Sequence, residues 1–202
     1  MAQTVKFWFD PACPFAWITS RWISEVEQAR GINVDFQVIS LGVLNEEHED
    51  QEDPQTQSKW QGARAAIAVR QRHGADKVAE FYTAAGTRIH NEGYGLERYD
   101  AALSEALEEI GVEDAAEILE ESKTSSCDDA LRESTKNALS LVGNDVGTPI
   151  IAIGDSAFFG PVMTRIPRGE EAGKLWDGFA ALVEYPYFYE LKRARTSDLD
   201  FS

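Results

Sequence analysis

Cysteine is scarce in this chain, and so are basic residues. Two cysteines, Cys13 and Cys127, in 202 residues provide no framework of structural disulfides. The 19 lysines and arginines are outnumbered by 35 aspartates and glutamates, which gives a formal net charge of −16. Such a charge repels phosphate backbones and anionic membrane surfaces, so neither nucleic acid nor a membrane is expected as a partner.

Long apolar runs are missing as well. No uninterrupted apolar stretch approaches the ~20 residues that a membrane-spanning helix requires. The first ten residues, MAQTVKFWFD, lack the basic segment and apolar segment of a secretory signal. Together with the few cysteines, this predicts a cytoplasmic protein in a reducing compartment. The apolar share of 43% is sufficient for a globular core.

The first 40 residues alternate between strand and helix patterns. Residues 4–9 are β-branched and aromatic, which is typical of a buried strand. From Pro14, apolar residues recur every three or four positions until Gly31, which predicts a helix with a glycine at its end. Residues 33–40 alternate and predict a second strand. A strand, a helix and a strand in this order predict a parallel pair with a right-handed crossover.

The middle of the chain contains helical patterns and no strand pattern. An acidic loop at residues 45–53 comes first. The helical patterns then cover residues 55–73, 75–91, 97–110, 113–123 and 126–142. Strand chemistry returns at residues 148–153 and 156–160, which predict a hairpin. Residues 166–167, Ile-Pro, predict the start of a last helix that ends near Val183.

Without its middle part, the chain reads β-α-β followed by β-β-α, which is the thioredoxin arrangement. We therefore predict an α/β protein with a thioredoxin fold and an all-helical insertion. Residues 1–44 and 144–202 are predicted to form the thioredoxin-like domain, and residues 45–143 the helical insertion subdomain.

The residue around which the chemistry is predicted is Cys13, between the first strand and the first turn of the following helix. Pro14 suits the first position of that helix. Unpaired N–H groups and the positive end of the helix dipole stabilise a thiolate, so we expect the pKa of Cys13 to lie below the ~8.5 of a free thiol. A thiolate attacks disulfides and other electrophiles, which makes Cys13 the candidate nucleophile.

The second half of the candidate site is Thr148-Pro149. A proline directly before an apolar strand removes a hydrogen-bond donor from the sheet, so its presence requires a reason. In the thioredoxin arrangement this proline is cis and faces the cysteine. The backbone of the preceding residue, here Thr148, pairs there with a bound disulfide or peptide.

These segments carry a family resemblance. Residues 7–17, FWFDPACPFAW, resemble the active-site segment of the DsbA-like thioredoxin superfamily, most closely its actinobacterial branch of mycothiol-dependent reductases and nitroreductases. Residues 145–149, DVGTP, are similar to the cis-proline loop of that family. Its C-terminal segment is matched by parts of residues 159–193, including FGPV, IPRGE, GKLW and YELKR.

The resemblance implies a thiol-disulfide oxidoreductase of DsbA type with a redox-active Cys13 and a cis-proline at Pro149. It implies no bound cofactor and a low-mass thiol, mycothiol, as co-substrate. The other partner would be a small-molecule or protein disulfide, or an electrophile that is reduced. A homodimer is consistent with the resemblance, although the sequence indicates no interface.

Ala16 departs from the family pattern. That pattern is Cys-Pro-aromatic-Cys, and Ala16 occupies the position of the resolving cysteine. Without a thiol there, a mixed disulfide on Cys13 has to be resolved by a second thiol molecule. A natural monothiol enzyme and an introduced replacement that traps a mixed disulfide both fit the sequence. Cys127 begins a helix of the insertion and is not expected to reach Cys13.

Two other functions remain open. Asp10, Cys13, Pro14 and Phe15 followed by a small residue also resemble kappa-class glutathione transferases and chromene-carboxylate isomerases. Those proteins carry serine at the nucleophile position, where its hydroxyl activates a bound thiol. In that case Cys13 would bind a thiol without forming a bond to it. A catalytically inactive thioredoxin-like binding protein is the third reading, and Ala16 is its only support.

The predicted site residues extend beyond the nucleophile. Asn45 follows the exit of the second strand, where ligands bind in parallel sheets, and His90 ends a helix of the insertion. No metal is expected, because the three histidines, His48, His73 and His90, have no metal-ligand spacing. The residues predicted to bind substrate are Pro14, Phe15, Asn45, His90, Thr148 and Pro149.

Overall fold

A computed structural model describes residues 3–202; the first two residues of the expected thioredoxin-like domain lie outside the described residues. The first third of the chain forms β1 (Thr4–Phe9), α1 (Pro14–Arg30), β2 (Asn33–Val38) and the short α2 (Leu41–Leu44). The middle forms α3 (Pro54–His73), α4 (Ala75–Gly86), the π-helical turn η1 (Thr87–Asn91), α5 (Tyr99–Glu109), α6 (Ala115–Ser122) and α7 (Asp128–Val142). The last elements are β3 (Ile150–Ile153), β4 (Ser156–Phe159) and α8 (Gly169–Glu184).

The four strands form one sheet in the order β2-β1-β3-β4. β1 is parallel to β2 and antiparallel to β3, and β4 is antiparallel to β3. This topology confirms the predicted α/β thioredoxin fold, with helices and loops but no strand between residues 45 and 143. The division into a domain and an insertion subdomain stays a prediction, because a single buried cluster joins β1 to the insertion helices.

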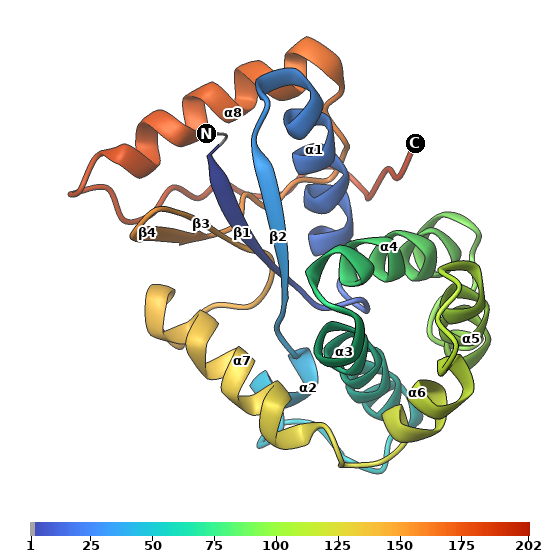
Figure 1. The fold of residues 1–202 in the computed structure, drawn as a ribbon. Coiled ribbons are helices and arrows are strands. Elements are labelled where there is room, and N and C mark those ends of the chain that lie inside the picture. Colours follow the sequence, from blue (N-terminus) through green and yellow to red (C-terminus); the bar gives the residue numbers. More distant parts are fainter. Residues whose placement is uncertain (1–2) are drawn as a thin grey trace.

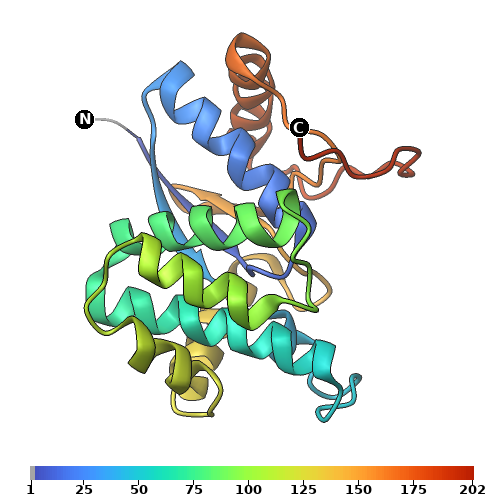
Figure 2. The same ribbon diagram turned by 90° about the vertical axis from the view of Figure 1, so that its right-hand side faces the viewer.

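The two faces of the sheet bury different side chains, as the two-residue period of a strand requires. Val5, Phe7 and Phe9 face the larger core, which also contains residues of α1, α4 and α8. Trp8 points to the opposite face, where it packs with Ala138 of α7. Figure 1 shows α1 and α8 next to each other and α7 apart from them. Figure 2 shows the helices of the insertion stacked below α1.

The last helix begins later than predicted. α8 starts at Gly169 rather than at residues 166–167, and the preceding Arg168 has an extended backbone. The chain before it is held extended by the C-terminal tail: the Asp200 N–H donates to the Thr164 carbonyl at 2.7 Å, and Arg165 pairs with Asp200 in an isolated β-bridge. A tertiary contact therefore overrides the helix-starting tendency of Pro167.

Strand β2 is also shorter than predicted. It ends at Val38, because the Ser40 side chain accepts a hydrogen bond from the Val43 N–H and caps α2 instead. The predicted helix over residues 75–91 divides into α4 and η1. None of the described helices is long and apolar enough to cross a membrane.

Candidate functional site

Cys13 is the N-cap residue of α1. Its backbone is extended, with φ −85° and ψ 113°, and Pro14 occupies the start of the helix. The Cys13 sulfur accepts a hydrogen bond from the Ala16 N–H at 3.4 Å. The predicted position of Cys13 at a helix N-terminus is therefore confirmed. The geometry directs the sulfur at the free N–H groups of the first turn.

The Thr148-Pro149 segment lies against Cys13. The Cys13 thiol donates to the Thr148 carbonyl at 3.5 Å, across 135 positions of sequence. The Thr148 hydroxyl donates to the Trp8 carbonyl at 3.1 Å, which ties this segment to β1. The peptide bond between Thr148 and Pro149 is cis. The two segments that the sequence singled out thus form one site.

Asp10 is a residue of this site for which the sequence analysis predicted no role. Its carboxylate is fully buried and accepts from the Ala12 N–H at 2.8 Å and from the Leu41 N–H at 2.7 Å. It therefore joins the loop before Cys13 to the start of α2. Burial raises the pKa of Asp10 to about 7, although both N–H donors oppose that rise. The sequence signal that could have pointed to this role is an aspartate at the start of a turn, because its side chain can accept a hydrogen bond from the backbone N–H two residues later.

The expected low pKa of Cys13 is wrong for this structure. The side chain is 6% exposed. Burial raises the pKa of the Cys13 thiol to about 11; the Ala16 N–H opposes this rise and the nearby Asp10 adds to it. A helix N-terminus lowers a thiol pKa where water and the helix N–H groups both solvate the sulfur, and here the loss of water has the larger effect.

His90 reaches the site through the loop before Cys13. Its Nε2 lies 2.9 Å from the Pro11 carbonyl, so Nε2 carries the hydrogen and donates it. Burial lowers the pKa of His90 to about 4, against the effect of the Pro11 carbonyl. The ring stacks on Trp17, with centroids 5.8 Å apart. The His90 ring also contacts Phe201 of the C-terminal tail, with ring centroids 5.7 Å apart.

The tail is held at this place by Asn91, which follows His90 in η1. Asn91 accepts from the Trp17 indole N–H and donates to the Phe201 carbonyl, both at 2.9 Å. Phe15 is half-buried, and the Arg195 guanidinium lies 4.8 Å above its ring. Two residues of the tail therefore cover residues that flank the Cys13 loop.

The remaining predicted residues differ in their placement. Ala16 is fully buried on the first turn of α1, and Pro149 is buried next to Thr148. Asn45 ends α2, where its amide donates to the Leu41 carbonyl at 3.0 Å. This contact holds Asn45 to α2, and its role toward a substrate stays a prediction. Within residues 3–202, no three His, Cys, Asp or Glu side chains gather as a metal site would require.

Comparisons with known proteins show what this chain is similar to. A curated relative, the uncharacterized protein Rv2286c of Mycobacterium tuberculosis, is 29% identical over 198 residues, which are 96% of this chain and 83% of the relative. Among solved structures, a 2-hydroxychromene-2-carboxylate isomerase has a TM-score of 0.58 and 17% identity, with 89% of this chain and 94% of that chain covered.

Two further solved structures share the fold. The probable DsbA oxidoreductase SCO1869 of Streptomyces coelicolor has a TM-score of 0.56 at 14% identity, covering 98% of this chain and 94% of the other. The cytosolic disulfide reductase DsbM of Pseudomonas aeruginosa, solved with GSH, has a TM-score of 0.55 at 14% identity, covering 88% and 99%. The family model described as Rv2466c-like, mycothiol-dependent nitroreductase Rv2466c, matches residues 12–193. With nine-tenths of its length matched, from the Cys13 loop to the tail, the chain belongs to the Rv2466c-like family.

Proposed function

We propose that this protein is a mycothiol-dependent thiol-disulfide oxidoreductase in which Cys13 is the nucleophile. The observation that carries the proposal is the Cys13 sulfur at the N-terminus of α1, hydrogen-bonded to the carbonyl of Thr148. Family membership supports mycothiol as the thiol that supplies electrons. A cytosolic location accords with such a thiol, because low-mass thiols are kept reduced there.

The reaction begins when the Cys13 thiolate attacks one sulfur of a disulfide. A bond forms between Cys13 and that sulfur, and the other sulfur leaves as a thiolate that takes a proton from solvent. Because Ala16 carries no sulfur, a mycothiol thiolate then attacks the substrate sulfur and releases Cys13. A second mycothiol reduces the resulting mixed disulfide. The balance is one disulfide and two mycothiols converted into two thiols and one mycothiol disulfide.

The residues of the site have separate tasks in this reaction. The Ala16 N–H stabilises the Cys13 thiolate, and the Thr148 backbone aligns the incoming disulfide. Since burial raises the pKa of Cys13 to about 11, the neutral thiol predominates at pH 7. The substrate therefore has to bring polar groups, or admit water, to the sulfur before attack.

Incubation with mycothiol disulfide, followed by peptide mass mapping, tests the proposal. We expect one mycothiol to be added at Cys13, with no addition in Cys13→Ser. Cys127→Ser is the matched control, and it should form the adduct as the wild-type protein does. If the wild-type protein forms no adduct on Cys13, the proposal is wrong.

A second candidate is a transferase or isomerase that uses a bound thiol. It is favoured by one observation: the Cys13 thiol is buried, neutral and already a hydrogen-bond donor to Thr148. In this function Cys13 would hold a bound thiol by hydrogen bonding alone. Calorimetric binding of mycothiol without a covalent adduct, retained in Cys13→Ser, would support it against the oxidoreductase.

A further inference from the structure

Tyr82 of α4 is held against both ends of the segment that carries Cys13. Its ring stacks on Phe9 at the end of β1, with centroids 3.7 Å apart and planes 17° apart. It also meets the edge of Trp17 in α1, at a centroid distance of 5.5 Å and an angle of 79°. Phe9 and Trp17 lie on either side of Cys13 in the chain. Two aromatic contacts therefore fix the direction of the tyrosine side chain.

The Tyr82 hydroxyl is buried without a partner. The side chain is 0% exposed, and within residues 3–202 its oxygen has no hydrogen-bond partner. Ser20 of α1 lies close to this hydroxyl. The Ser20 hydroxyl gives its one hydrogen to the Trp17 carbonyl at 2.6 Å and accepts from Arg21 at 3.2 Å, so it has no hydrogen left to donate to Tyr82. Leaving a buried hydroxyl unpaired is costly, so the group calls for an explanation.

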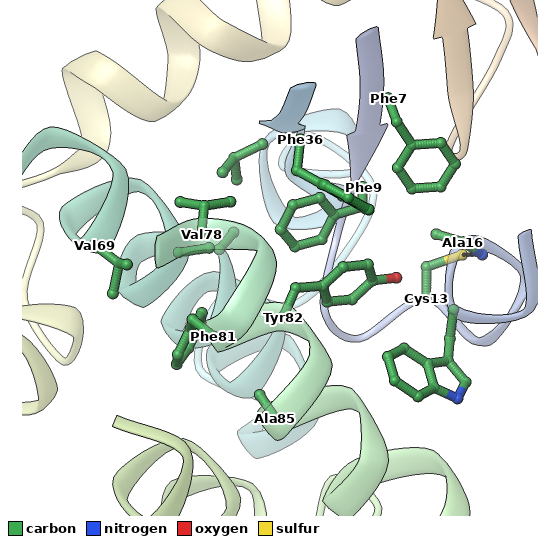
Figure 3. Packing of buried hydrophobic residues seen from close by; sticks show 14 of the residues in the cluster. Phe7, Phe9, Cys13, Ala16, Phe36, Val69, Val78, Phe81, Tyr82 and Ala85 are labelled. Carbon is green, nitrogen blue, oxygen red and sulfur yellow. Dashed lines mark hydrogen bonds between the residues drawn. The ribbon is translucent and has the colours of Figure 1, made fainter. Parts of the chain in front are cut away.

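Figure 3 shows where this hydroxyl is aimed: it points toward Cys13 and Ala16. The neutral thiol of Cys13 gives its hydrogen to Thr148 and accepts from the Ala16 N–H. A thiolate has no hydrogen to give and accepts further donors more strongly than a thiol does. Because residue 16 carries only a methyl group, no polar side chain there competes for the sulfur.

The charges around the sulfur show why an additional donor matters. Asp10, in the loop before α1, lies close enough to raise the pKa of Cys13 further. His90 of η1 is neutral and therefore brings no positive charge to the site. The guanidinium of Arg21 lies 4.2 Å from the centre of the Trp17 ring. Burial raises the pKa of Tyr82 well above its usual value, so its hydroxyl keeps the proton it would donate.

We propose that the Tyr82 hydroxyl is the hydrogen-bond donor that stabilises the Cys13 thiolate, and that its lack of a partner is a feature of the resting thiol state. This inference rests on the proposed role of Cys13 as the nucleophile. It makes Tyr82 a catalytic residue contributed by the helical insertion, whereas the rest of the site comes from the thioredoxin fold.

Tyr82→Phe tests the inference, because it removes the oxygen and keeps the ring. A hydrogen bond to a charged group is worth enough to change the thiolate population about ten- to a hundredfold. We therefore expect iodoacetamide to alkylate Cys13 about ten- to a hundredfold more slowly at pH 8 in the variant, with the rate profile shifted about one to two pH units upward. Peptide mapping separates Cys13 from Cys127. Since the lost hydroxyl has no partner, the melting temperature should not fall.

Tyr99→Phe is the matched control. Tyr99 of α5 carries the other buried hydroxyl without a partner, and that hydroxyl lies against Gly62 rather than Cys13. Its loss should leave the alkylation profile of Cys13 unchanged. The inference is overturned if Tyr82→Phe alkylates as the wild type does, or if Tyr99→Phe slows the reaction equally.

Failure of the inference is distinguishable from failure of the proposed function. A wild-type mycothiol adduct combined with an unchanged Tyr82→Phe profile removes the role of Tyr82 and leaves Cys13 as the nucleophile. An absent adduct combined with a shifted profile removes the oxidoreductase and leaves the hydrogen bond to the thiolate in place.

Discussion

Two cysteines occupy the same kind of position in this protein and have different surroundings. Cys13 is the N-cap of α1, and Cys127 is the N-cap of α7. Each has an alanine three positions later in the chain, and the two side chains are 6% and 4% exposed. The Cys13 sulfur accepts from the Ala16 N–H, whereas Cys127 makes no side-chain cap bond and donates to the Glu121 carboxylate at 3.6 Å.

The difference between them lies in backbone conformation and in neighbours. Cys13 is extended, which turns its sulfur toward the helix N–H groups, while Cys127 is helical, with ψ near 0°. The carboxylate of Glu121 opposes an anion at Cys127, and α7 begins with Asp128 and Asp129. A cysteine at a helix N-terminus is therefore no nucleophile by position alone. The segment packed against the sulfur decides whether the cysteine can act as one.

The sharpest way to test this comparison is to place a second thiol after each cysteine. Ala16→Cys should form a disulfide with Cys13 under mild oxidation, seen as the loss of two hydrogens in the intact mass. Ala130→Cys offers the same spacing after Cys127 but should remain reduced, because the Cys127 sulfur is not turned into the helix. If both variants oxidise equally, spacing alone decides and the comparison fails. Overpacking at fully buried residue 16 costs about 1–3 kcal/mol, so its fold has to be verified.

The second prediction concerns the buried acid near Cys13. The pKa of Asp10 is raised from 3.8 to about 7 in the folded state, so the folded chain keeps a proton that the unfolded chain releases. Its contribution to stability is fully present below pH 3.8 and is lost as the pH rises through 7. Relative to Asp10→Asn, the wild type should lose about 2–3 kcal/mol of unfolding free energy between pH 5 and 8.

Urea titrations at several pH values measure this difference. A wild type and Asp10→Asn variant with parallel stability curves would show that the buried carboxyl does not titrate in this range.

The smallest expected effect belongs to the C-terminal tail, which covers the Cys13 side only. Phe201→Ala removes the ring beside His90 and should admit water to the Cys13 loop, so alkylation of Cys13 should rise a few-fold while Cys127 is unaffected. Tyr189→Ala is the control, since that tail residue is 79% exposed. An equal increase in both variants would indicate general loosening of the tail.

Much of the fold was predictable because the spacing of apolar residues, and the prolines and glycines that begin and end helices, act over a few residues. The strand at residues 4–9 and the helix between Pro14 and Gly31 follow from spacing, and the observed αL conformation of Gly31 matches its predicted role. The start of α8 was not predictable. The contact between Thr164 and Asp200 that holds this segment extended joins residues far apart in the chain.

The site was predictable in part, for a similar reason. Cys13 and Thr148-Pro149 can each be recognised from their neighbours in the sequence, and the structure brings them together. The pKa of Cys13 and the roles of Asp10 and Tyr82 were hidden, because each depends on what other segments place around a side chain. In the sequence Tyr82 is one residue of the helical pattern over residues 75–91, and the docking of α4 decides where its hydroxyl points.

The amino-acid sequence by itself determined the order of strands and helices and the placement of a cysteine at the first turn of α1, since hydrophobic spacing and proline act over a few residues. Tertiary structure alone decided how much water reaches that sulfur and which donors and charges surround it. Solvation and electrostatics are summed over every group within several ångströms, and those groups come from β1, α4, η1 and the tail.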